Sequence, residues 1–169
     1  PPGTSDEPLT VSQSLPGIDG VVIVTTPQEV ALLDSRKSIN FAKTISVPVL
    51  GVVENMRGYT LRGTSTPNSK ISVMGPGGVP IECHSDEDGN WEMTLDVFKS
   101  GGGEEASKEM GVPFLGSLPF DPGIVRGGDD GVHRIIAEPE GETARAFESI
   151  VESVIEQLDK GSQRTLRII

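Results

Sequence analysis

The chain has 169 residues, enough for one domain with a hydrophobic core, and carries a formal net charge of −11. This acidic balance, without a compensating basic patch, argues against nucleic-acid binding, because phosphate backbones attract basic surfaces. One cysteine excludes an intrachain disulfide framework, and no apolar run approaches the ~20 residues of a membrane span, so we expect a cytoplasmic protein with no membrane contact.

The first residues (1–6) are rich in Pro, Gly, Ser and Asp and predict a loop. Because the chain begins Pro-Pro-Gly-Thr rather than with Met, we interpret it as part of a longer polypeptide. Two β-branched apolar runs, 21–24 and 47–53, then flank a segment with helical spacing. Four of its residues share one face: Leu32, Ser35, Ile39 and Ala42. This pattern predicts a strand–helix–strand unit of a parallel sheet, with strands buried on both faces.

Polar residues follow both predicted strands. Thr25 and Thr26 end the first strand, and Glu54 and Asn55 end the second. Ligands of open parallel sheets bind beyond the carboxyl ends of the strands, so these residues mark the first candidate site.

Residues 57–95 lose the helical period. Short alternating pieces around 71–73, 79–83 and 91–95 are separated by Gly-rich and Asp-Gly turns. The pattern predicts a small antiparallel meander that is too short to be a domain by itself. We interpret it as a β-rich insertion within a single partial domain that spans residues 1–169.

The α/β pattern resumes after residue 99. We predict a short helix capped by Gly111, a buried strand over 112–118 and a Gly-rich loop over 123–131. The last helix is predicted over 142–160 and ends at Gly161. Its expected apolar stripe has six members: Phe147, Ile150, Val151, Val154, Ile155 and Leu158. The expected fold class is α/β, with a partial doubly wound parallel sheet and a small antiparallel insertion.

Five stretches, in order, resemble the Mrp-type iron–sulfur cluster carrier ATPases of the ParA/MinD group of P-loop NTPases. They are PPGTSDE at Pro1, IVTTPQEVALLDSRKSINF at Ile23, VPVLGVVENM at Val47, SGGGEEASKEMGVPFLGSLPFDP at Ser100 and RGGDDG at Arg126. The resemblance implies a P-loop NTPase-like fold, ATP binding with Mg²⁺, slow ATP hydrolysis, a homodimer, a 4Fe-4S cluster bridged between subunits, and recipient or scaffold proteins as partners.

Two features of that family are absent from the sequence. The Walker A loop, which holds phosphates through backbone N–H groups and a Lys, lies N-terminal to the matching region in the family. The Cys-x-x-Cys pair that usually follows the Asn-Met dipeptide is replaced here by residues 57–95, with Cys83 alone. We therefore expect this chain alone to be inactive as an ATPase.

The resemblance assigns candidate nucleotide-site residues. Residues 1–6 resemble switch II, in which Gly3 would offer an N–H to the γ-phosphate and Asp6 would position a partner group; the alternative is a turn capped by Asp6. Asn55 would contact adenine through its amide, or else bond its own backbone as a turn residue. Residues 119–121 (Pro119, Phe120 and Asp121) resemble the segment around the base, although Phe120 also suits a core position.

Cys83, followed by His84, is the candidate metal ligand. Thiolate and imidazole bind iron or zinc, but a closed site needs about four ligands. A dimer would bring two Cys83 thiolates together; the alternative is a small apolar filler.

Three functions are therefore compared. The first is the C-terminal part of an ATP-binding iron–sulfur cluster carrier or assembly protein. The second is a ParA/MinD-type positioning ATPase. The third is a non-enzymatic interaction module on a degenerate NTPase scaffold.

Overall fold

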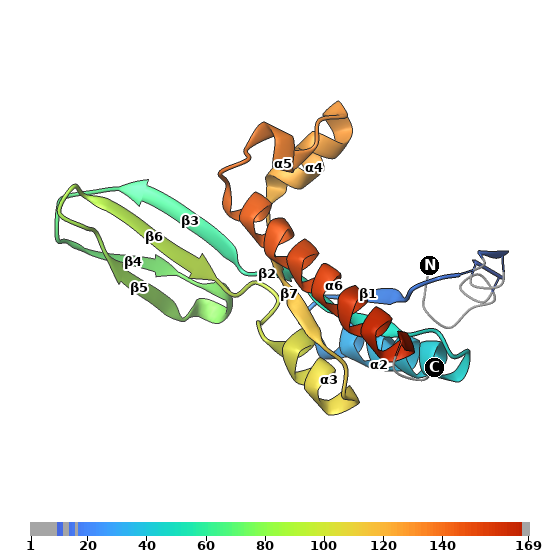
Figure 1. The fold of residues 1–169 in the computed structure, drawn as a ribbon. Helices are drawn as coiled ribbons and strands as arrows, with labels where there is room; N and C mark the ends of the chain where they lie inside the picture. Colours follow the sequence, from blue (N-terminus) through green and yellow to red (C-terminus); the bar gives the residue numbers. More distant parts are fainter. Residues whose placement is uncertain (1–9, 12–13, 16, 167–169) are drawn as a thin grey trace.

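The computed structural model describes residues 10–11, 14–15 and 17–166, and its centre is a three-stranded parallel sheet in the order β1–β2–β7 (Figure 1). The strands are β1 (Val21–Thr25), β2 (Val49–Arg57) and β7 (Phe114–Pro119). Parallel pairing confirms the strand–helix–strand prediction, with α2 (Glu29–Thr44) as the crossover helix. The buried residues of α2 are the four that share one helical face in the sequence.

Helices cover the two faces of this sheet (Figure 1). Helix α2 packs on β1 and on α3 (Gly102–Met110), and α3 packs on β2 and β7. Helix α6 (Glu142–Leu166) lies across the opposite face, over β7 and β2. At the contact between α6 and β7, a Cβ on Gly116 would lie 2.8 Å from Ile150 Cγ1, so glycine permits the close approach.

Strand β1 differs from the sequence prediction. Its pattern is alternating, and Val22 and Val24 are exposed. The prediction of burial on both faces is therefore wrong for β1, because the face of the strand that carries these two valines is open to solvent.

Residues 57–95 form two nested hairpins, which we call the hairpin segment; it extends away from the sheet (Figure 1). Strand β3 (Tyr59–Thr64) pairs with β6 (Asn90–Leu95), and β4 (Lys70–Met74) pairs with β5 (Pro80–His84) around a short 3₁₀ turn, η1 (Pro76–Gly78). The predicted meander is therefore wrong in topology, and β3 was missed because Arg62 and Gly63 interrupt its apolar pattern.

A polar junction joins the two hairpins. Ser85 is buried; its Oγ donates to the carbonyl of Thr66 at 2.6 Å and accepts from the N–H of Ser69 at 2.9 Å. These bonds satisfy buried polar groups where the chain passes from one hairpin to the other.

The predicted Gly-rich loop is instead a helix, α4 (Pro122–Asp130), followed by the short α5 (Arg134–Ala137). Asp121 caps α4 by accepting a hydrogen bond from Gly123 N at 2.7 Å, and Pro122 occupies the first turn. Gly131, with φ of 69°, ends it. The cap and the proline outweigh the low helix propensity of the internal glycines.

The helix that precedes β7 is as expected, since α3 ends at Gly111 in the left-handed conformation. Helix α6 continues past Gly161, so the predicted stop is wrong; a glycine inside a helix costs only about 1 kcal/mol relative to alanine. Its buried stripe is also narrower than predicted, because Val151 and Ile155 are exposed. No helix in the described ranges is long and apolar enough to cross a membrane.

Candidate functional site

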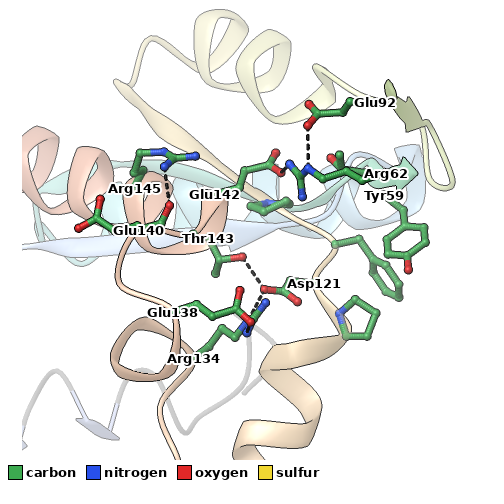
Figure 2. Close-up of a pocket in the computed structure, with 15 residues that line it drawn as sticks. Tyr59, Arg62, Glu92, Asp121, Arg134, Glu138, Glu140, Glu142, Thr143 and Arg145 are labelled. Carbon is green, nitrogen blue, oxygen red and sulfur yellow. Dashed lines mark hydrogen bonds and ion pairs between the residues drawn. The ribbon is translucent and has the colours of Figure 1, made fainter. Parts of the chain in front are cut away.

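A cavity of about 420 Å³ opens where the carboxyl end of β7 meets the hairpin segment (Figure 2). We call it the β7 cavity. Its walls come from β3, β6, the residues after β7, and the chain from α5 to the start of α6. This position is the one at which open parallel sheets bind ligands.

Asp121 organises one side of the β7 cavity. Its Oδ2 accepts hydrogen bonds from Arg134 Nε at 2.7 Å and Thr143 Oγ1 at 2.6 Å (Figure 2). Its Oδ1 accepts a hydrogen bond from Gly123 N. Burial alone would raise the pKa of Asp121, but the hydrogen bonds from Arg134, Thr143 and Gly123 outweigh it and leave the pKa lowered. Both carboxylate oxygens are thus used to join α4, α5 and α6, and Asp121 shapes the cavity.

Phe120 forms an aromatic group with one residue of the hairpin segment and one that follows it. Its ring meets Tyr59 edge-to-face at 5.9 Å and Phe98 at 6.0 Å between centroids. Its backbone N–H donates to the carbonyl of Gly58 at 2.8 Å. These contacts fix the start of the hairpin segment against the end of β7.

Arg62 forms the second link between the hairpin segment and the body. Its Nε contacts Glu92 Oε2 at 2.7 Å, and its Nη2 contacts Glu142 Oε2, at the start of α6, at 3.1 Å (Figure 2). The guanidinium is therefore shared between two carboxylates that belong to different elements.

Glu54 lies on the opposite side of β2 from α6, and it is fully buried. Its Oε1 accepts from Gly101 N at 3.1 Å and its Oε2 from Gly103 N at 2.6 Å. The N-terminus of α3 is thus already occupied by an internal carboxylate. The negative charge of Glu54 interacts favourably with the helix dipole and disfavours a phosphate at the same position.

The structure brings together three of the predicted nucleotide-site residues, because Pro119, Phe120 and Asp121 all line the β7 cavity. Asn55 does not line it: its Oδ1 accepts from Met56 N at 2.9 Å, as a turn residue does. Adenine contact by Asn55 stays a prediction. Gly3 and Asp6 lie outside the described residues.

Sequence reasoning missed the rest of the cavity wall. Tyr59, Arg62 and Glu92 lie in the hairpin segment, and Arg134 and Thr143 lie beyond β7. One signal in the sequence could have indicated this wall. Arg62 and Glu92 carry opposite charges and are direct cross-strand partners when β3 pairs with β6.

Cys83 is half-buried and pairs with Ile71 across the β4–β5 hairpin. His84 follows it in an extended strand, so the two side chains point to opposite faces. Across the described part of the chain, no group of three or more His, Cys, Asp or Glu residues is placed to hold a metal ion. Ligand duty for Cys83 stays a prediction.

The parallel sheet, its helical layers and the cavity at a strand's carboxyl end define an α/β protein of the open-sheet class. The family model described as "ParA: NUBPL iron-transfer P-loop NTPase" matches residues 1–87 and 82–155, and the chain belongs to this family.

Curated relatives agree with this assignment. The chain is 36% identical over 159 residues to an iron-sulfur cluster carrier protein of Methanocaldococcus jannaschii, covering 94% of this chain and 45% of the relative. It is 40% identical over 154 residues to one from Synechocystis sp., covering 91% and 36%. The chain thus spans less than half the length of these relatives.

Solved structures share the fold. The cell division ATPase MinD of Pyrococcus furiosus superposes with a TM-score of 0.51 at 23% identity, covering 82% of this chain and 43% of that one. The septum site-determining protein MinD of Pyrococcus horikoshii, solved in complex with Mg-ADP, gives 0.50 at 24% identity, covering 80% and 41%.

Proposed function

We propose that this chain supplies the base-binding side of an ATP site in an iron–sulfur cluster carrier, in which ATP binding and slow hydrolysis control cluster loading or release. The observation that carries the proposal is the β7 cavity, lined by Pro119, Phe120 and Asp121 at the carboxyl end of a parallel strand. An aromatic ring beside a proline in a cavity wall suits the binding of a flat base, which stacks on ring faces.

The Walker A part of such a site is not encoded in these 169 residues, since the sequence has no Gly-rich loop ending in Lys-Ser or Lys-Thr. The nearest internal candidate, the Gly-rich start of α3, holds the Glu54 carboxylate, which would repel a phosphate. In this proposal Gly3 and Asp6 belong to a switch II-like segment near the γ-phosphate and Mg²⁺. The other contacts to the phosphates come from a Walker A loop that these 169 residues do not contain.

The cluster is cargo in this proposal, not a resident cofactor. Iron–sulfur clusters are held mainly by cysteine thiolates, and each chain offers Cys83 alone. A homodimer would supply two such thiolates from symmetry-related positions, and a recipient or scaffold protein would supply further ligands during transfer.

Calorimetric titration of ATP into the complete encoded polypeptide tests the nucleotide site. The variant Phe120→Leu removes the ring that lines the cavity, and Phe98→Leu is the matched control, because Phe98 contacts the same ring from outside the cavity. We expect Phe120→Leu to weaken ATP binding about tenfold, at the lower end of base–aromatic stacking, and Phe98→Leu to have a smaller effect. Equal affinities for all three proteins would contradict the proposal.

A further inference from the structure

One wall of the β7 cavity is formed by residues 134–143, which run from the start of α5 to the first turn of α6 (Figure 2). We call this stretch the pinned loop. Six of its residues line the cavity, namely Arg134, Glu138, Glu140, Gly141, Glu142 and Thr143. Residues 135–140 are all exposed, so the middle of the loop is not held by burial in a core. The position of this wall must therefore be set at the two ends of the loop.

Both ends of the pinned loop donate to the same atom. Arg134 Nε lies 2.7 Å and Thr143 Oγ1 lies 2.6 Å from Asp121 Oδ2 (Figure 2). Asp121 is itself held in place, because its Oδ1 accepts a hydrogen bond from Gly123 N at the start of α4. One carboxylate directly after β7 thus closes the base of the loop and joins it to the opposite side of the cavity, where Phe120 lies.

The two ends of the loop are attached in different ways. Arg134 is shared between Asp121 and Glu138, so its guanidinium has a second carboxylate partner within the loop. Thr143 is only 5% exposed, and among the described residues its hydroxyl bonds to Asp121 alone. A buried hydrogen bond to a charged acceptor is stronger than one between neutral groups. The attachment of α6 to the end of β7 therefore depends most on the Thr143 hydroxyl.

We propose that Thr143 is a positioning residue for nucleotide binding, which acts through Asp121 to hold the pinned loop at the separation from Phe120 that the β7 cavity requires. Loss of the hydroxyl frees one end of the loop, and a ligand must then order that wall when it binds. Ordering a wall on binding lowers affinity, whereas a wall that is already in place does not. This inference rests on the proposed ATP site and adds a residue that sets its affinity without contacting the ligand.

The test measures the ATP dissociation constant by calorimetry on the complete encoded polypeptide. Thr143→Val replaces the hydroxyl by a methyl group of similar size, and we expect it to weaken ATP binding about threefold to tenfold, the range that one lost hydrogen bond covers. Thr143→Ser keeps the hydroxyl and should bind ATP within about twofold of the wild type.

Hydrogen exchange without nucleotide provides a second measurement that does not depend on ATP. Thr143→Val should speed amide exchange in residues 134–143, because one end of the loop is released, and should leave the exchange of β7 unchanged. This local pattern separates a displaced wall from a general loss of folding, which would speed exchange in β7 as well. Faster exchange in β7 by the same factor would contradict the positioning role.

Ser107→Ala is the control, because it removes a buried hydroxyl that bonds within α3, away from the cavity. Its ATP affinity should equal that of the wild type. Wild-type affinity in Thr143→Val, affinity in Thr143→Ser as weak as in Thr143→Val, or an equal loss in Ser107→Ala would overturn this inference and leave the proposed function intact. Absence of ATP binding to the wild type would overturn the proposed function and the inference together.

Discussion

Glu54 Oε2 accepts a 2.6 Å hydrogen bond from the backbone N–H of Gly103, which lies 49 residues later in the chain. The whole hairpin segment lies between these two residues in sequence. The bond therefore joins β2 to the first turn of α3, the two elements of the α/β body between which the hairpin segment is inserted. The Glu54 carboxylate also disfavours a phosphate at the Gly-rich start of α3, because both groups carry negative charge.

Removing the Glu54 carboxylate should destabilise the fold, because the N–H groups of Gly101 and Gly103 would lose their acceptor in a buried place. We expect Glu54→Ala to lower the free energy of unfolding by about 1–3 kcal/mol or more, and Glu54→Gln by less, since its amide oxygen still accepts one bond. Urea unfolding followed by Trp91 fluorescence measures both. Wild-type stability in Glu54→Ala would contradict this role.

The close approach of α3 to β2 requires glycine at position 103. A Cβ there would lie 2.9 Å from the Cβ of Glu54, so Gly103→Ala should destabilise the protein by about 1–3 kcal/mol. Gly128→Ala in α4 is the matched control: nothing lies within 4 Å of its Cβ position, and we expect a gain of about 0.4–1 kcal/mol. Equal effects of the two substitutions in urea unfolding would refute the steric argument.

Asp121 should make stability depend on acid pH. Its pKa is lowered in the folded state, because hydrogen bonds from Arg134, Thr143 and Gly123 outweigh the effect of burial. A lowered pKa contributes stability that is present above the unfolded value of about 3.9 and is lost as pH falls through the folded value.

The check is a series of urea midpoints between neutral and acid pH for the wild type and Asp121→Asn. We expect the variant to be less stable at neutral pH and the difference to shrink below pH ~4, where the wild-type carboxyl also becomes neutral. Asp129→Asn, an exposed position on the same helix, should follow the wild type. A difference that stays constant with pH would exclude Asp121 as the source.

Under the proposed function, cluster binding by this chain depends on Cys83. After anaerobic reconstitution of the complete encoded polypeptide with iron and sulfide, we expect thiolate–iron charge-transfer absorption that disappears in Cys83→Ala. The matched control Ser72→Ala, on the neighbouring strand β4, should retain it. Iron that persists in Cys83→Ala would place the ligands elsewhere, and no iron in the wild type would remove the cluster from this account.

Local patterns in the sequence were sufficient to predict the central α/β unit. The buried face of α2 follows from helical spacing, and the stop of α3 follows from Gly111, because both signals act within a few residues. Helix α4 was missed because its glycines predicted a loop. The helix-start signal, Asp121 as N-cap followed by Pro122, was not used.

The cavity could be predicted only in part, since its walls come from segments far apart in the chain. Residues 119–121 were found through the family resemblance, whereas Tyr59 and Arg62 reach the cavity only through the pairing of β3 with β6. A nested pairing across 30 residues leaves no local periodic signal, so Arg62 looks like an ordinary exposed residue in the sequence.

The most direct test of the account is photolabelling of the complete encoded polypeptide with an azido-ATP that carries its reactive group on the base, followed by peptide mapping. The account predicts labelled peptides that contain Phe120 or Tyr59, the aromatic residues of the β7 cavity, with protection by unmodified ATP. Protected labelling confined to the start of α3, around Gly101–Gly103, or no protected labelling at all, would contradict a base-binding site at the end of β7.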